Sequence, residues 1–374
     1  MPPTIAIDAR KLCDFGIGTY VRELVRHLAE LDRESRYVLL VRPEDRGALP
    51  DLPANFLASP EPSKGYSARE LWSVSRHLRR LGAELYHATH YTVPLWPPCP
   101  VVVTVHDVIH LLFPELLPNR AALHYARFML RRAVRRSRGV IAVSHATRDD
   151  LVETVGAEPQ RIRVIHNGVE GRFAHRLEPA EVEARLARHG LASPYLLYVG
   201  NSKAHKNLER LLEGYARARA LLAAPLPPLV LAGTRAGAEA LRAHAERVGI
   251  GDALRIVGWI PDEDLPALYQ GATLFTYPSL YEGFGLPVLE AMASGTPVLT
   301  SRNSALRELA GGHAELVDPW EPDDIARGIA YCLADEGHRR RLVERGRERA
   351  AQFGWPRVAA ATLAVYREAL AGAA

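Results

Sequence analysis

The sequence predicts an α/β fold with two doubly wound domains, and three observations lead to this prediction. Short apolar runs rich in β-branched residues alternate with longer helical patterns along the whole chain. These runs lack a clean polar–apolar alternation, which is typical of parallel strands buried on both faces. The pattern also begins again near residue 195, and 374 residues suit two domains of ordinary size.

The N-terminal half carries candidate strands separated by helical patterns, which is the pattern of βαβ units in a parallel sheet. The helical patterns include Gly18–Leu31, Ala68–Leu81 and Ala121–Arg136. The candidate strands are Thr4–Ile7, Tyr37–Val41, Glu84–His87, Val101–Val105, Val140–Val143 and Arg163–Ile165.

The same pattern returns after the charged segment Glu178–Pro194. We therefore predict an N-terminal domain over residues 1–188, a C-terminal domain over 189–352 and a final helical segment over 353–374. Helical segments are expected from Leu208, Ala236, Asp264, Pro287, Asp323 and His338. The candidate strands of this half are Tyr195–Val199, Leu229–Ala232, Arg255–Val257, Leu274–Tyr277, Pro297–Thr300 and Glu315–Val317.

The composition is typical of a soluble globular protein, with 48% hydrophobic and 24% charged residues. No apolar run approaches the ~18–20 residues that span a bilayer, and the N-terminus lacks a basic-then-apolar signal sequence. Cys13, Cys99 and Cys332 are far apart in the sequence, so neither a disulfide framework nor a zinc site is expected. We expect a cytoplasmic protein.

The segment from Arg127 to Arg138 holds six arginines in twelve residues. This helix face could simply be solvated, or it could bind anionic lipid head groups or a pyrophosphate-bearing acceptor. Lipid binding would place the protein peripherally at the inner membrane face. Nucleic acid is not expected as a partner, because no stacking platform or nucleic-acid motif accompanies the arginines. The arginines proposed for lipid contact are Arg131, Arg132, Arg135 and Arg136.

Residues that directly follow strands are the first candidates for a site, because open α/β sheets bind ligands beyond the carboxyl ends of their strands. Two such domains facing each other would place a reaction in the cleft between them. Gly16 and Gly18 open the first helix, where glycine allows close backbone approach and the helix start favours an anion. A simple tight turn is the alternative. His106 follows the fourth strand and either faces a ligand or bonds a backbone carbonyl.

In the second half, the loop after the first strand carries Lys203, His205 and Lys206 just before a helix. This loop combines a strand end, a glycine and a helix N-terminus, and that combination favours phosphate binding. Lys206 is the candidate for holding a diphosphate. The acidic run Asp262–Asp264 superficially resembles a metal-binding motif. We interpret it as helix capping, so no metal is expected.

The strongest signal is the segment Tyr277–Pro297. Its glycines make a flexible loop, and Pro287 suits the first turn of the helix that follows. Glu282 lies in the loop and Glu290 in the helix, so two carboxylates flank a helix N-terminus that could bind a diphosphate. A hydrolase acid–base pair is the alternative. The adjacent anion-binding helix start favours a donor that already carries phosphate.

These motifs resemble those of the retaining nucleotide-sugar glycosyltransferases of the GT-B class, family 4, along nearly the whole chain. The stretch EGFGLPVLEAMASGTPV is similar to that family's motif of two glutamates separated by seven residues, here Glu282 and Glu290. The GIG turn, the THD strand end, the NGV turn and the VGN and KN motifs occur in the same order. The resemblance implies two Rossmann-like, doubly wound domains facing across a cleft. It also implies a final segment from Phe353 that crosses back onto the N-terminal domain.

The resemblance further implies roles for matching residues. Lys206 would hold the diphosphate, Glu282 would hold the donor sugar, and His106 would contact that sugar from the acceptor side; these three are the catalytic candidates. Many relatives carry an arginine where this chain has Asn201, so Lys203 is expected to supply the second positive charge. Glu290 would bind the ribose diol. The other donor-binding candidates are Gly16, Gly18, Trp259, Ile260, Gly283, Phe284, Gly285 and Leu286.

The expected reaction is transfer of a hexose from a nucleotide sugar to a glycan or lipid-linked acceptor in polysaccharide or glycolipid assembly. Mannose from GDP-mannose is the first candidate donor, and the resemblance implies retention of configuration without a metal or another cofactor. Two alternatives stay open. One is a different enzyme on the same plan, such as a sugar-nucleotide epimerase or a phosphorylase, and the other is a non-catalytic subunit that binds nucleotide sugar.

Overall fold

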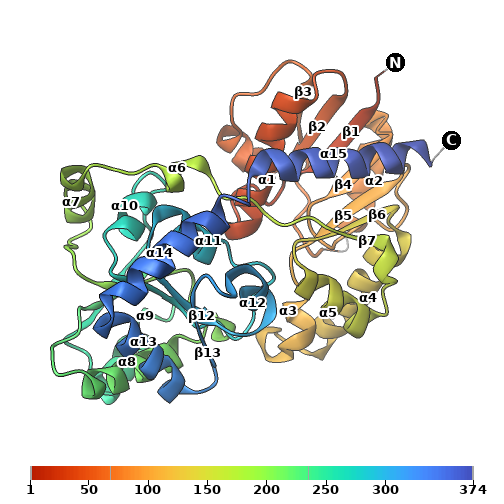
Figure 1. Ribbon diagram of the computed structural model, residues 1–374. Coiled ribbons are helices and arrows are strands. Elements are labelled where there is room, and N and C mark those ends of the chain that lie inside the picture. The colour runs from red at the N-terminus through yellow and green to blue at the C-terminus, as the bar shows by residue number, and fades with distance from the viewer. Residues whose placement is uncertain (1, 68, 235, 373–374) are drawn as a thin grey trace. The chain divides into compact units, whose positions relative to one another are not determined.

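The computed structural model describes residues 2–67, 69–234 and 236–372. The chain divides into two compact units, each built around its own sheet (Figure 1). Unit 1 comprises Met1–Gly168 together with Gly354–Ala374, and unit 2 comprises Val169–Phe353. The charged segment that begins at Glu178 lies in unit 2, where its helix packs on the helix that begins at Leu265. The C-terminal helix belongs to unit 1.

Unit 1 contains a seven-stranded sheet with the order β3-β2-β1-β4-β5-β6-β7. All of its pairings are parallel, and Ile5 of β1 lies between Tyr37 of β2 and Leu85 of β4. The strands are β1 (Thr4–Asp8), β2 (Arg36–Val41), β3 (Phe56–Pro60), β4 (Leu85–Ala88), β5 (Val101–Val105), β6 (Gly139–Ala142) and β7 (Ile162–Val164).

Two hydrophobic clusters cover the two faces of this sheet. One combines residues of α1 and α15 with the strands, and the other combines residues of α2, α4 and α5 with the strands. The helical elements of unit 1 are α1 (Phe15–Leu31), η1 (Pro43–Ala48), α2 (Glu70–Leu81), α3 (Ile109–Leu112), η2 (Pro114–Leu116), α4 (Arg120–Arg136), α5 (His145–Val155), η3 (Pro159–Arg161) and α15 (Trp355–Ala371).

A buried chain of hydrogen bonds ties α15 and α1 to the sheet. The Tyr366 hydroxyl lies 2.6 Å from Nδ1 of His87, and Nε2 of His87 lies 2.8 Å from Oγ1 of Thr104. The same Thr104 oxygen lies 2.9 Å from the Tyr20 hydroxyl of α1. All four side chains are buried, so the last helix of the chain is an integral part of the unit 1 core.

Unit 2 contains a six-stranded parallel sheet with the order β10-β9-β8-β11-β12-β13. Its strands are β8 (Leu196–Val199), β9 (Leu229–Ala232), β10 (Leu254–Val257), β11 (Leu274–Tyr277), β12 (Val298–Ser301) and β13 (Glu315–Val317). Its helical elements are α6 (Gly171–Ala174), α7 (Pro179–Ala187), η4 (Ala204–Lys206), α8 (Leu208–Leu221), α9 (Ala238–Arg247), α10 (Leu265–Gln270), α11 (Leu286–Ser294), α12 (Ser304–Ala310), α13 (Pro322–Ala334) and α14 (Glu336–Ala350).

The α/β prediction is confirmed, and every predicted strand overlaps an observed one. The prediction missed β3, the edge strand next to β2. Its sequence, FLASP, has no β-branched residue and ends in proline, which is tolerated at a sheet edge. Helix α1 begins at Phe15, three residues before the predicted start. Helix α2 begins at Glu70, and the predicted start at Ala68 lies outside the described residues.

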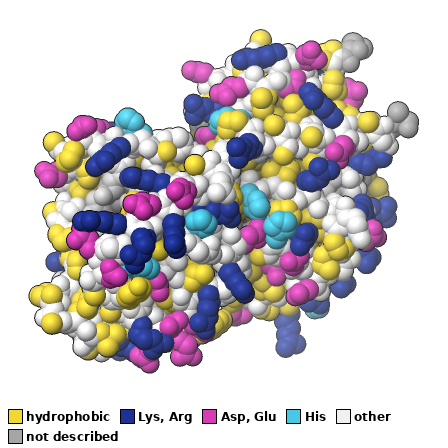
Figure 2. Space-filling view, viewed as in Figure 1, with side chains coloured by type: hydrophobic (Ala, Val, Ile, Leu, Met, Phe, Trp, Pro, Cys, Tyr) yellow, Lys and Arg dark blue, Asp and Glu magenta, His cyan; other side chains and the backbone are white. Residues whose placement is uncertain are grey.

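Charge is mixed on the face of the molecule that Figure 2 shows. Lys and Arg side chains are interspersed with Asp and Glu in the view of Figure 2, in keeping with a formal net charge of only +4. Among the described residues, no helix combines the length and the apolar character that crossing a bilayer requires.

Candidate functional site

The strand order of unit 2 by itself indicates where a candidate site lies. The chain leaves β8 for β9 and β10 on one side of the sheet, then returns to β11 on the other side. The carboxyl ends of β8 and β11 therefore form a topological switch point, where doubly wound sheets bind their ligands. The two loops that begin there contain Lys206 and Glu282.

Lys206 and Glu282 form an ion pair at this switch point. Nζ of Lys206 donates to Oε1 of Glu282 at 2.7 Å and to the Tyr277 hydroxyl at 2.9 Å. The two charged side chains are only 13% and 12% exposed. Burial acts to raise the pKa of Glu282, but the charge and hydrogen bond of Lys206, together with smaller contributions from His205 and Ser279, hold that pKa below its usual value. A sheltered ammonium group with an ionised partner is therefore fixed between the two loops.

The loop before Lys206 is fastened to the loop after β11 by several hydrogen bonds. Asn207 adopts a left-handed conformation with φ of 62° where η4 meets α8. Its buried side-chain amide donates to the carbonyls of Pro278 (2.9 Å) and Pro319 (2.6 Å). The Leu280 amide donates to the His205 carbonyl at 2.7 Å. These bonds hold the backbone on both sides of Lys206 in place.

Helix α11 begins immediately after the Glu282 loop. Its N-cap is Gly285, with φ of 101°, a conformation that strains any residue with a Cβ atom. A Cβ atom there would lie 2.7 Å from Cδ2 of Leu306. Leu286 and Pro287 form the first turn, and glycine offers no side chain to cap it. The positive end of the helix dipole therefore lies only a few residues after Glu282 in the chain.

Glu290, the other half of the two-glutamate motif, has a different environment. It lies in α11 and its Oε2 accepts a hydrogen bond from the Tyr269 hydroxyl at 2.8 Å. Burial raises the pKa of Glu290 to about 7, and the neighbouring Glu170 carboxylate acts in the same direction. The pKa of one glutamate of the motif is thus lowered by a neighbouring cation, while burial raises the pKa of the other towards neutral pH.

The remaining donor-binding candidates of unit 2 differ in exposure. Trp259 is 60% exposed, whereas its neighbour Ile260 is buried. Oδ1 of Asn201 accepts from the Lys203 amide at 3.2 Å, and the Lys203 side chain is exposed. Gly283 and Phe284 are buried next to Gly285, and the Phe284 ring packs edge-on against Phe353 at 6.0 Å between ring centroids.

The capping role predicted for the acidic run before α10 is wrong for Asp264. Asp264 occupies the N-cap position but makes no side-chain capping bond. Its carboxylate instead pairs with Arg188 at 3.3 Å and with His189 at 2.9 Å. Asp262 lies 3.8 Å from Arg172. The run is thus bound to basic side chains of the segment that enters unit 2.

A different cluster in unit 2 combines ligand types that metal ions use. Potential ligand atoms of Glu315, Cys332 and His338 lie within 4.8 Å of one another. Nε2 of His338 lies 3.0 Å from a Glu315 carboxylate oxygen, and burial raises the pKa of the Cys332 thiol to about 12. A protonated thiol beside a hydrogen-bonded Glu315 and His338 accounts for this cluster as packing between β13, α13 and α14.

In unit 1 the corresponding switch point lies between β1 and β4. Oγ1 of Thr89 donates to the Asp8 carbonyl at 2.6 Å and joins the two strand ends. Gly16 and Gly18 lie in the first turn of α1, not in a loop before it. Gly18 is buried, and a Cβ atom there would lie 2.4 Å from the Leu12 carbonyl oxygen. Glycine at this position therefore lets the helix start close to the β1 loop.

His106 directly follows β5 and is bonded to a backbone carbonyl. Its Nε2 lies 2.9 Å from the Thr89 oxygen, so this nitrogen carries the proton and Nδ1 is the acceptor. Burial lowers the pKa of His106 to about 4, and nearby Lys11 contributes in the same direction. The imidazole is therefore neutral near pH 7. Its ring packs edge-on against Tyr20 at 4.8 Å between centroids.

The structure adds residues to the strand ends of unit 1 that the sequence did not single out. Nζ of Lys11 lies 5.0 Å from the centre of the Tyr66 ring, and the Tyr66 hydroxyl lies 2.9 Å from Nε2 of His90. Burial, with the nearby charges of Lys11 and Arg10, lowers the pKa of His90 well below its usual value. The sequence could have pointed to Lys11, Tyr66 and His90 only through their positions soon after predicted or observed strands.

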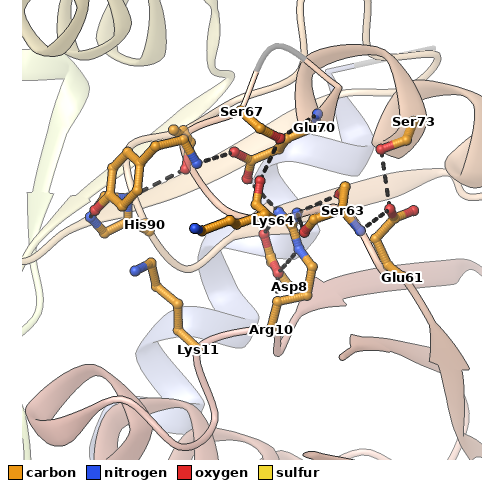
Figure 3. Close-up of polar contacts among 12 residues, drawn as sticks. Asp8, Arg10, Lys11, Glu61, Ser63, Lys64, Ser67, Glu70, Ser73 and His90 are labelled. Carbon is orange, nitrogen blue, oxygen red and sulfur yellow. Dashed lines mark hydrogen bonds and ion pairs between the residues drawn. The ribbon is translucent and has the colours of Figure 1, made fainter. Parts of the chain in front are cut away.

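A buried ion-pair network underlies these residues (Figure 3). The guanidinium of Arg10 bonds Asp8 at 2.5 Å, Glu70 at 2.7 Å and the Ser63 hydroxyl at 3.1 Å. Glu70 in turn accepts from the Tyr66 amide at 2.7 Å, where Tyr66 has a left-handed φ of 62°. Arg10 thereby fastens Ser63 and Glu70 to the end of β1.

The basic helix α4 presents most of its predicted arginines to solvent. Arg131, Arg135 and Arg136 are exposed. Arg132 is half-buried, and its guanidinium donates to the carbonyls of Leu95 and Pro94. Arg132 is therefore committed to a contact inside unit 1, which corrects its assignment to a lipid-binding face.

Solved structures confirm the class that this fold defines. The chain matches the sucrose-phosphate synthase of Thermosynechococcus elongatus with a TM-score of 0.80 and 23% identity, over 99% of this chain and 100% of the other. It matches WaaG, a glycosyltransferase of lipopolysaccharide biosynthesis, with a TM-score of 0.75 and 19% identity, over 96% and 98% of the two chains. The fold is that of the GT-B glycosyltransferases.

Sequence comparisons give the family. Residues 16–171 match the profile described as Glycosyltransferase Family 4, and residues 185–349 match Glycosyl transferases group 1. An O-antigen chain mannosyltransferase B from Escherichia coli is 31% identical over 80% of this chain and 77% of its own. A Mycolicibacterium hassiacum MMP alpha-(1->4)-mannosyltransferase is 33% identical over 65% of this chain and 57% of its own. The chain belongs to the family 4, group 1 glycosyltransferases, and it is a glycosyltransferase enzyme.

Proposed function

We propose that this enzyme transfers mannose from GDP-mannose to a glycan or lipid-linked acceptor, with retention of configuration. The observation that carries the proposal is the sheltered Lys206–Glu282 pair at the unit 2 switch point, next to the uncapped start of α11. An ammonium group and a helix N-terminus together suit the diphosphate of a nucleotide sugar. The mannosyl part of the proposal is supported by the mannosyltransferase names of the sequence relatives.

In the proposed reaction the bond between the anomeric carbon and the diphosphate oxygen breaks, and the acceptor oxygen bonds to the same face of that carbon. The acceptor proton passes to the departing diphosphate, and the nucleoside diphosphate leaves. Negative charge grows on the leaving group, so Lys206 and the α11 dipole would stabilise the transition state more than the ground state. Glu282 would hold sugar hydroxyls, Glu290 the ribose diol, and neutral His106 would contact the sugar as a hydrogen-bonding group.

We propose that no metal takes part, because a fixed cation and a helix N-terminus can supply the positive charge that a metal ion otherwise supplies. Transfer should then persist in excess EDTA. We also propose that the exposed arginines of α4, namely Arg131, Arg135 and Arg136, contact anionic lipid when the acceptor is membrane-bound. Sedimentation with phosphatidylglycerol vesicles tests this contact, and it should weaken when the three arginines are replaced by glutamine.

The Lys206→Ala variant tests the central assignment. Losing one group that stabilises the leaving diphosphate should lower kcat by at least ~10²-fold. The exposed Lys64→Ala variant, in unit 1, serves as a control for a lost surface charge and should stay near wild type. Wild-type turnover by Lys206→Ala would contradict the proposal. The donor is identified by a thermal-shift screen of GDP-, UDP-, ADP- and dTDP-sugars, because a ligand that binds the native state raises its Tm.

A further inference from the structure

A hollow of about 930 Å³ in unit 1 lies outside the donor site and carries two exposed tryptophans. Trp72 lies on α2 and is 60% exposed; Trp96 lies on the loop after β4 and is 54% exposed. Their ring centroids are 4.5 Å apart with the planes inclined at 44°. Exposed large aromatic rings are costly in a solvated surface, so a pair that lines a hollow indicates a binding surface.

The aromatic pair is held in place by the fold. The Leu95 amide donates to the Leu71 carbonyl at 3.3 Å, which joins the Trp96 loop to α2. From the other side, the Arg132 guanidinium bonds the carbonyls of Pro94 and Leu95. Both contacts reach residues next to the tryptophans. The two rings are therefore presented from a fixed backbone, which lowers the entropy cost of binding.

Polar groups line the rest of the hollow. Glu61 is buried and accepts hydrogen bonds from Ser73 at 3.1 Å and from Nδ1 of His77 at 2.9 Å. Arg69 and Arg76 also line the hollow, with exposed side chains that enter no ion pair within the described part of the chain. Aromatic faces beside hydrogen-bond donors are a combination that suits sugar rings, which have an apolar C–H face and a rim of hydroxyl groups.

The hollow adjoins the carboxyl-end edge of the unit 1 sheet. Glu61 follows the last residue of β3, and its carboxylate bonds the Ser63 amide at 3.1 Å. Ser63 bonds Arg10, and Arg10 bonds Asp8 at the end of β1 (Figure 3). A glycan whose reacting end lies over these strand ends could therefore extend along the same edge onto the tryptophans. A lipid bilayer is flat, so a concave surface fits a glycan better.

We propose that the Trp72–Trp96 hollow is a glycan-binding subsite that holds sugar residues of the acceptor remote from its reacting end. The rings stack on the C–H faces of successive sugars, while Arg69, Arg76 and the Glu61–His77 pair bond hydroxyl groups or acidic substituents. The subsite rests on the proposed function, since a glycan acceptor is what would fill it. It would make the enzyme prefer long acceptors over single sugars.

Equilibrium binding without donor tests the subsite independently of catalysis. The probes are linear hexasaccharides of α-linked mannose, α-linked glucose and β-linked N-acetylglucosamine, with methyl α-mannoside as the short comparison. At least one hexasaccharide should bind, and Trp72→Ala or Trp96→Ala should weaken it about tenfold, because each ring covers on the order of 50 Å² of apolar sugar surface. Trp320→Ala, which removes a 50% exposed tryptophan of unit 2, should bind like wild type.

Two results would overturn the subsite: no hexasaccharide binds, or hexasaccharide binding survives in the Trp72→Ala/Trp96→Ala double variant. If a variant that keeps the hexasaccharide also loses binding to phosphatidylglycerol vesicles, the surface is assigned to lipid. Nucleotide binding and donor hydrolysis by water should be unchanged in the double variant. Loss of the proposed transferase function would appear in those donor measurements and not in hexasaccharide binding, so the two failures are distinguishable.

Discussion

The pKa values of the two glutamates in the Glu282–Glu290 motif are shifted in opposite directions, although the residues are only eight positions apart. The Lys206 charge keeps Glu282 ionised, whereas burial raises the pKa of Glu290 to about 7. A carboxylate held ionised accepts hydrogen bonds from sugar hydroxyls at any physiological pH. A carboxyl near its pKa can gain or lose a proton when a ligand arrives. The motif thus combines a constant group with a titratable one.

Glu290 should make nucleotide binding pH-dependent. If the ribose hydroxyls donate to its ionised form, affinity should increase about tenfold from pH 6 to pH 8, since a group with a pKa of about 7 goes from mostly protonated to mostly ionised over that range. Isothermal titration of GDP against wild type and Glu290→Gln checks this. The ratio of the two affinities at each pH removes the contribution of the nucleotide's own phosphate.

The same pKa shift has an opposite effect on stability. Between the ordinary value of 4.5 and about 7, the folded protein holds a proton that the unfolded chain has released. The free energy of unfolding should therefore decrease as pH rises through this range, and Glu290→Gln should lack that part of the decrease.

The affinity measurement can contradict the assignment of Glu290. If the ratio of the wild-type to the Glu290→Gln affinity for GDP does not change with pH, Glu290 is not at the nucleotide.

The sequence could supply the members of the site but not their contacts. The strand-end positions of Lys206 and Glu282 are visible in the pattern of strands and glycines. Their ion pair spans 76 residues and depends on β8 lying beside β11, which is a property of the sheet order. The hydrogen bond from Tyr269 to Glu290 depends in the same way on packing between α10 and α11.

At the scale of elements, the buried hydrogen bonds that link α15 to α1 through His87 and Thr104 should contribute measurably to stability. Tyr366→Phe leaves a nitrogen of buried His87 without its partner at 2.6 Å. Leaving a buried polar group unsatisfied costs about 1–3 kcal/mol. Urea unfolding of unit 1 should show this loss, whereas Tyr331→Phe, at a 47% exposed position of α13, should change little. Equal stability of the two variants would contradict a structural role for this bond.

Helices and strands could be predicted where the local residue types strongly prefer one structure. They were predicted less well where contacts with distant parts of the chain determine the structure. Buried parallel strands such as Val101–Val105 consist of β-branched residues, and Ser144 caps helix α5 by accepting a 2.9 Å hydrogen bond from the Thr147 amide. Strand β3 has weak local preference and exists because β2 offers it an edge. Helix α1 includes Gly16 as well as Gly18, whereas the predicted helix began at Gly18, with Gly16 in the turn that opens it.

At the scale of the whole molecule, the chain enters unit 2 at Val169 and leaves it at Phe353, and the amide of the first donates to the carbonyl of the second at 3.1 Å. Unit 2 is therefore a continuous stretch of sequence inserted between the parts of unit 1. The last part of unit 1 is α15, which contributes Trp355, Val358 and Leu363 to the core of that unit. The core of unit 1 therefore includes C-terminal residues, whereas unit 2 ends before them at Phe353.

Removing residues 354–374 should unfold unit 1 selectively. The truncated chain loses the aromatic and aliphatic side chains of α15 from one face of the sheet, and a buried tryptophan alone covers roughly 150–250 Å². The α11 and Lys206 contacts all lie within residues 169–353 and remain. In hydrogen exchange, amides of β1, β4 and β5 should lose protection, while those of β8 and β11 keep theirs and gain more when GDP is added. Protected β1 amides in the truncated chain would show that α15 is dispensable, and loss of protection in both units would show that unit 2 cannot fold without unit 1.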